Sequence, residues 1–340
     1  MSLIKLPIKR LKKQPNFEES WEVFFKLLLS SSSDIDKKTK TGQTALMIAA
    51  GRRYDHGIRS ILATGANPNL QNDVQKATPL MYAMNGLFRC RHEWCPSDVA
   101  IKNKNITEAL LQKGADPNIP DIKGNTPLII ASISKEVHGR ADLLRFLLAK
   151  GAEPNVCNKH GMTPLMFAAK SIRRCNVEAL LQFGADVSSV NNWGSTALLL
   201  VTYHNCEELG KTECPSVIRI AKCLIEAGSD VNTKNFFGFT PLMSAARKGH
   251  MGLVQYLLSV GADWTLQDEH GDTALLIAAQ SGYPNICNIL QNLGGNIATD
   301  KIRKHQSLLE KSKDNNATMP KNQILPSRES ELSDTILSIY

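Results

Sequence analysis

Long hydrophobic runs are absent from this chain, and their absence limits what it can be. In its 340 residues no apolar stretch approaches the roughly 18 residues that indicate a membrane-spanning helix. The first residues also lack the apolar core of a secretory signal peptide. The eight cysteines are scattered along the sequence, so we expect mostly reduced thiols in an intracellular, cytoplasmic protein.

Signatures of catalysis are missing as well. The sequence contains no G-x-S-x-G elbow, no Walker A loop, no dinucleotide fingerprint and no H-E-x-x-H motif. Serine, histidine and aspartate are plentiful, but a catalytic triad also needs these side chains to converge in space. We therefore expect a protein that is not an enzyme and that uses no cofactor.

An excess of acidic residues is absent too. The formal net charge is +8, yet five cations without any anion precede residue 14, and the repeated part of the chain is nearly neutral. A near-neutral body is not typical of a nucleic-acid groove, so we expect no nucleic-acid partner. The run Lys9-Arg10-Leu11-Lys12-Lys13 is a candidate nuclear address or a contact for an anionic surface, and a solubilising leader is the plainer alternative.

What the chain does contain is a repeated unit, which is clearest in residues 238–263. Thr240 can accept a hydrogen bond from an orphan backbone N–H at a helix start, and Pro241 suits the first helical position. Ala245 is small enough for a second helix to lie close to the first. Gly249 supplies the left-handed residue that ends this first helix.

A second helix follows within the same unit. Val254, Leu257 and Leu258 form an i, i+3, i+4 apolar stripe, which predicts an amphipathic helix that ends at Gly261. The polar run from Asp263 onward then predicts a turn or hairpin before the next unit.

The unit occurs seven times. Its threonine recurs at Thr44, Thr78, Thr126, Thr163, Thr196, Thr240 and Thr273, each followed by Pro-Leu or Ala-Leu. The copies close on a glycine at Gly65, Gly114, Gly151, Gly184, Gly228, Gly261 and Gly294. The shortest interval between successive threonines is 33 residues, and the second and fifth units are longer.

A period near 33 residues with Thr-Pro-Leu and Gly-Ala-Asp signatures resembles the ankyrin repeat family. The resemblance covers roughly residues 16–299 and implies an all-α solenoid of helix-turn-helix units joined by β-hairpin-like loops. The family often has histidine after Thr-Pro-Leu. This chain instead has Met47, Met81, Ile129, Met166, Leu199, Met243 and Leu276, so we expect apolar packing in place of a polar network.

The repeats divide the chain into four regions. We expect a basic flexible leader at 1–15, an N-terminal capping half-repeat at 16–41, seven ankyrin repeats at 42–299 and a mostly disordered tail at 300–340. Two insertions, about 86–103 and 204–215, separate the two helices of the second and fifth repeats. Insertions of this kind usually project from one face of a repeat array.

The resemblance implies a non-catalytic, monomeric interaction scaffold or adaptor that docks a partner protein on its concave surface. The alternative is a metal-binding or enzyme-associated protein that uses the insertions. Its ligands would be Cys90, His92 and Cys95 in repeat two and His204, Cys206 and Cys214 in repeat five. Zinc needs about four converging ligands, and the two loops lie three repeats apart without a C-x-x-C pair, so we expect no metal. We expect Cys175 and Cys287 to be small core residues.

Aromatic residues on consecutive hairpin tips are the leading candidates for partner binding. We expect Trp193, Phe236 and Phe237 to face solvent there and to contact the partner, because aromatics dominate binding hot spots. The alternative is that Phe237 folds onto a neighbouring hairpin. Lys159, His160 and His270 lie at equivalent tip positions and complete the predicted partner-binding set.

The resemblance also implies one modification site. Leu224, Asp230, Val231 and Asn232 match the leucine–acidic–valine–asparagine pattern that an asparaginyl hydroxylase uses in ankyrin proteins. We therefore expect Asn232 to be a site of hydroxylation.

Overall fold

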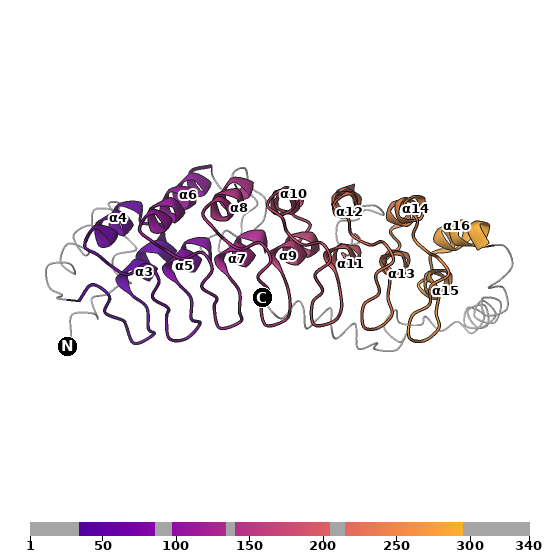
Figure 1. The fold of residues 1–340 in the computed structure, drawn as a ribbon, viewed down its shortest axis with the longest axis horizontal. Helices are drawn as coiled ribbons and strands as arrows, with labels where there is room; N and C mark the ends of the chain where they lie inside the picture. Colours follow the sequence, from indigo (N-terminus) through magenta and orange to yellow (C-terminus); the bar gives the residue numbers. More distant parts are fainter. Residues whose placement is uncertain (1–33, 86–96, 134–139, 205–214, 295–340) are drawn as a thin grey trace, which may run out of the picture.

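In a computed structural model the chain forms an elongated stack of paired helices (Figure 1). The structure describes residues 34–85, 97–133, 140–204 and 215–294. Two rows of helices run along the stack, and a third row of loops lies beside the first helices of the pairs (Figure 1). Over the described ranges there is no β-strand, only an isolated bridge between Gln267 and Thr273, so the fold is all-α.

The first helices of the pairs form the inner row. They are α3 (Ala45–Arg52), α5 (Pro79–Asn85), α7 (Pro127–Ile133), α9 (Pro164–Lys170), α11 (Ala197–Thr202), α13 (Pro241–Arg247) and α15 (Ala274–Gln280). The second helices form the outer row. They are α4 (Asp55–Ala63), α6 (Ser97–Gln112), α8 (Arg140–Ala149), α10 (Arg174–Gln182), α12 (Pro215–Glu226), α14 (Met251–Ser259) and α16 (Pro284–Gly294).

The repeated threonine starts the inner helices as expected. In the first six units its hydroxyl accepts the backbone N–H three residues later, as Thr240 does from Met243 at 3.3 Å. The expectation of purely apolar packing at the residue that follows Thr-Pro-Leu or Thr-Ala-Leu needs a correction. The sulfurs of Met47 and Met243 accept the backbone N–H of Thr44 and Thr240 at 3.5 Å, so both methionines help to cap the helix.

A single hydrophobic core runs the length of the array, from Leu46 to Leu290. Ala245 and Ala246 are fully buried, in agreement with the close helix contact inferred from their size. Gly249 has a φ of 73° just after α13, which is the left-handed conformation expected at the end of that helix.

Several predicted regions lie outside the described residues. They are the leader 1–15, residues 16–33 of the expected capping half-repeat, and the tail 300–340. The first insertion differs from our expectation, because α6 begins at Ser97 and residues 97–103 are helical. With 16 residues, α6 is the longest of the described helices. No helix in the described residues is long and apolar enough to span a membrane.

Candidate interaction surface

Five successive hairpin turns, from Asp121 to Asp268, share one internal geometry. An asparagine or aspartate at the start of each of these five turns accepts backbone N–H groups from residues two and four positions later. Asn191 accepts from Trp193 at 3.0 Å and from Ser195 at 2.9 Å, and Asn235 accepts from Phe237 at 3.0 Å and from Phe239. Both asparagines are buried, so these bonds are shielded from water and fix the turn.

Neighbouring turns are also joined to each other through their backbones. The N–H of Phe236 donates to the carbonyl of Trp193 at 3.1 Å, and the N–H of Asn192 donates to the carbonyl of His160 at 3.1 Å. The same bond joins Lys159 to Lys123 and Glu269 to Phe237. The tips therefore form one hydrogen-bonded row that holds its side chains in a defined order.

The three aromatic tip residues differ in exposure. Phe236 is 64% exposed, and its ring lies over Gly194, where an added Cβ would come within 2.6 Å of a ring carbon. Trp193 and Phe237 are only partly exposed and pack against the core. The expectation that all three side chains face solvent is therefore wrong for Trp193 and Phe237.

The Trp193 ring stacks on a neighbouring repeat. It lies parallel to the His160 ring, with 6.1 Å between ring centroids and an interplanar angle of 7°. Two large planar groups on successive hairpins thus support one another, which keeps them in place before any partner arrives.

The remaining predicted tip residues divide into two groups. Lys159 is exposed beside His160, and its carbonyl accepts the Asn192 side-chain amide at 3.0 Å. His270 is exposed on the last described hairpin, among Asp268, Glu269 and Asp272. The structure therefore places Lys159 and His160 next to the aromatic tips and places His270 in an acidic turn.

Residues of the inner row that the sequence reasoning missed complete this surface. Lys170, Tyr203 and Arg247 each lie seven positions after a capping threonine and are half-buried. The Arg247 guanidinium lies 5.7 Å from the centroid of the Phe239 ring. Counting from each threonine would have found this row, because the same helical position recurs on each repeat.

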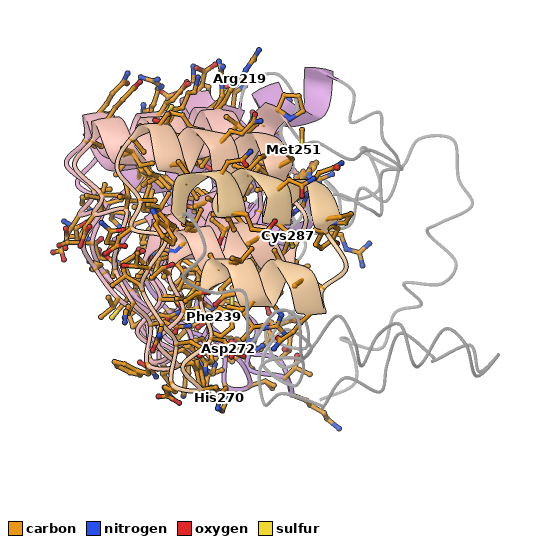
Figure 2. All side chains as sticks on the ribbon, turned by 90° about the vertical axis from the view of Figure 1, so that its right-hand side faces the viewer. Arg219, Phe239, Met251, His270, Asp272 and Cys287 are labelled. Atoms are coloured by element: carbon orange, nitrogen blue, oxygen red, sulfur yellow. The ribbon has the colours of Figure 1, made fainter. Side chains whose placement is uncertain are left out.

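Figure 2 shows the order of the outer helices, inner helices and hairpin tips in a view along the stack. Arg219 of the outer row lies at one edge and His270 at the opposite edge, with Phe239 and Asp272 between His270 and the helices. We call the surface made by the hairpin tips and the inner helices the inner face.

The predicted metal ligands lie outside the described residues except for His204. The backbone carbonyl of His204 accepts the His250 ring nitrogen at 2.8 Å, and burial lowers the pKa of that imidazole. In the described part of the chain no three His, Cys, Asp or Glu side chains gather as a metal site would need. Cys175 is half-buried rather than fully buried, and Cys287 packs against the core, where burial raises the pKa of its thiol.

The side chain of Asn232 bridges two consecutive units. Its amide donates to the carbonyl of Gly261 at 3.3 Å, and its oxygen accepts the N–H of Asp263 at 2.8 Å. Asn118 makes the same pair of bonds three units earlier in the array, to Gly151 and Glu153. The candidate modification site is thus part of a structural bridge.

Comparison with known proteins agrees with this architecture. A model of ankyrin repeats matches residues 19–95, 136–212 and 215–301, and a single ankyrin repeat model matches residues 75–122. Human SH3 and multiple ankyrin repeat domains protein 2 is 30% identical over 263 residues, which cover 70% of this chain and 14% of that protein.

Two further relatives match over shorter stretches. Human Rabankyrin-5 is 30% identical over 118 residues, covering 35% of this chain and 10% of that protein. Mouse 2-5A-dependent ribonuclease is 38% identical over 74 residues, covering 22% of this chain and 9% of that protein. This chain spans at most 14% of the length of these three relatives. Because the repeat models match most of its residues, the chain belongs to the ankyrin repeat family.

Proposed function

We propose that the protein is a non-catalytic interaction scaffold that docks a partner protein on its inner face. The observation that carries the proposal is the row of hydrogen-bonded tips that holds His160, Trp193, Phe236 and Phe237 on three consecutive hairpins. A surface that is already ordered loses little conformational entropy when a partner binds. Large aromatic side chains add much contact area at low entropic cost.

Family membership supports this proposal. Ankyrin arrays stack into extended surfaces suited to recognition, and the family is generally a non-catalytic interaction module. We propose that the protein is a monomer with protein partners. The near-neutral charge of the repeats supports the absence of a nucleic-acid partner, and the scattered cysteines support an intracellular location. The alternative of a metal-dependent role through the insertions rests on residues outside the described ranges, apart from His204.

Phe236 provides the sharpest test, because it is the aromatic tip residue that is exposed. Phe236→Ala should weaken partner binding by about 2 kcal/mol, or roughly thirtyfold in affinity, without changing the melting temperature. Ile122→Ala is the matched control, since Ile122 is 50% exposed on a hairpin outside the aromatic cluster.

The measurement is made in two steps. Proximity labelling in cells with the wild-type chain and both variants identifies partners that depend on Phe236, and calorimetric titration with a purified partner gives the affinities. Partner sets that are identical for all three proteins would place docking elsewhere. One tightly bound zinc equivalent in the purified protein would instead support the metal-dependent alternative.

We also propose that Asn232 is hydroxylated, as the family pattern implies. The side chain must leave its bonds to Gly261 and Asp263 to enter an active site, so we expect partial modification. Asn118 and Asn155 are internal controls, because they make similar bridges but follow proline rather than valine. Peptide mass spectrometry of cell-derived protein should show an added oxygen at Asn232 only, and its consistent absence there would count against the proposal.

A further inference from the structure

The two helical layers differ in the sign of their charges. The seven inner helices contain Arg52, Lys170 and Arg247 but no aspartate or glutamate. The outer helices carry both signs and form internal ion pairs, such as Arg174 with Glu178 at 3.2 Å. The inner helices therefore supply only positive charge to the inner face.

Two of these cations lie in one row over three consecutive repeats. Lys170 ends α9, Tyr203 directly follows α11 and Arg247 ends α13, and α11 packs against both of the other helices. The Tyr203 hydroxyl accepts the side-chain amide of Asn235 at 3.2 Å. Because Asn235 organises the hairpin that carries Phe236, the row is joined to the aromatic tips.

The bland explanation is that cations at helix ends offset the helix dipole. That effect does not require burial, yet Lys170 has lost enough water for its pKa to fall to about 8. Arg247 lies against the Phe239 ring, on an apolar support that leaves its charge in a partly desolvated setting. A carboxylate that binds beside partly buried cations of this kind forms charge-assisted hydrogen bonds, which are stronger than hydrogen bonds between neutral groups.

The next repeat limits how far an anionic ligand can extend. Its inner side carries Asp272, whose carboxylate accepts the Gln280 side chain at 3.3 Å, and its hairpin carries Asp268 and Glu269. These groups repel a carboxylate, so the favourable region covers the repeats of α9, α11 and α13.

We propose that Lys170 and Arg247, with Tyr203 between them, bind the carboxylates of an acidic segment of the partner protein. This inference rests on the proposed function and specifies the chemistry of the partner. The geometry sets a spacing for the ligand. Neighbouring packed helices lie about 8–10 Å apart, so α9 and α13 are roughly 16–20 Å apart. An extended chain advances about 3.3 Å per residue, so two carboxylates about five or six residues apart reach both cations.

The test uses a fluorescent synthetic peptide with two glutamates about six residues apart, and its glutamine counterpart. Anisotropy titrations are made with the full chain. We expect the glutamate peptide to bind and the combined Lys170→Gln and Arg247→Gln variant to lose at least about tenfold in affinity. The control is Arg219→Gln with Lys222→Gln on α12, which removes the same net charge from the outer layer and should leave binding unchanged.

A further variant protects the test against loss of folding. Lys170→Arg keeps the charge and should retain peptide binding, with thermal melting as the check for every variant. Equal losses in the inner and outer double variants would mean non-specific attraction and overturn the proposal. A glutamate peptide that binds no better than its glutamine counterpart would overturn it too, as would stronger binding of a single-stranded DNA oligonucleotide.

The cellular experiment separates this inference from the proposed function. If Phe236→Ala loses its partner while the inner double variant keeps it, the scaffold function stands and the acidic-segment inference fails. If neither variant changes the set of partners, the proposed docking surface itself is wrong.

Discussion

The backbone just after several inner helices is left-handed, and different residue types occupy this position in different repeats. Nine positions after the capping threonine the chain has Arg53, Ile172, Gly249 and Gly282, all with φ between 54° and 79°. Glycine adopts this conformation without steric cost, whereas a β-branched residue such as isoleucine is strained there. Two of the repeats therefore tolerate backbone strain at a position where two others avoid it.

The two glycines allow strain and crowding to be separated. A Cβ at Gly249 would overlap the Tyr283 ring, whereas a Cβ at Gly282 meets nothing within 4 Å. We expect Gly282→Ala to destabilise the protein by about 1–2 kcal/mol through backbone strain alone. Gly249→Ala should cost more, by about 1–3 kcal/mol, because the ring must also move. Urea unfolding measures both, and equal losses would show that Tyr283 yields freely.

Side-chain direction is the part of the residue scale that the sequence could not supply. The repeat register correctly assigned Trp193, Phe236 and Phe237 to hairpin tips, but it could not show which of them packs inward. That choice depends on neighbours from another repeat, such as His160, whose ring stacks on Trp193. The helix-capping role of the Met47 and Met243 sulfurs was missed because methionine was treated as purely apolar.

At the scale of elements, a ladder of asparagine side chains joins successive units. Asn69, Asn118, Asn155 and Asn232 each donate to a glycine carbonyl of the next unit and accept an N–H two residues beyond it. Ser188 occupies the equivalent place in the fourth unit. Its hydroxyl instead donates to Asp186 at 2.6 Å, and this bond contributes to lowering the pKa of that carboxyl.

An asparagine at position 188 should strengthen the junction between the fourth and fifth units. Ser188→Asn places an amide within reach of Gly228 and Asp230, and we expect a gain of about 1 kcal/mol for the added hydrogen bonding. Asn155→Ser, at a junction that has the bridge, should lose a similar amount. Urea midpoints of the two variants give the comparison. A loss without the matching gain would mean that Gly228 and Asp230 are too far away to be bridged.

Element existence was predictable from the sequence, while one boundary was not. Threonine caps, small inner residues and the apolar stripes of the second helices all correspond to observed helices. The start of α6 was missed because residues 97–103 were assigned to the insertion. Ser97 and Asp98 are nevertheless favourable at a helix start, where a hydroxyl or carboxylate can satisfy orphan N–H groups and the helix dipole favours negative charge.

At the scale of the whole molecule, stability is distributed along one dimension. Helix pairs pack against the pairs before and after them, and the core is continuous without a separate centre (Figure 1). The sequence predicted this arrangement because seven copies of one unit leave each repeat with the same neighbours. The repeat register also gives the charge difference between the layers, which was missed because charge was counted over all the repeats together and not helix by helix.

The one-dimensional arrangement predicts that damage in one repeat stays local. Ala245 is fully buried in α13, which packs between α11 and α15, so Ala245→Leu should cost about 1–3 kcal/mol by overpacking. Native-state hydrogen exchange should show faster exchange in α11 to α16 and nearly unchanged protection in α3 to α5. Gln255→Leu, at an exposed position of α14, is the control and should alter neither the urea midpoint nor the exchange pattern. Equal loss of protection along the whole array would show instead that the repeats unfold as one cooperative unit, with coupling between neighbours stronger than the intrinsic stability of any single repeat.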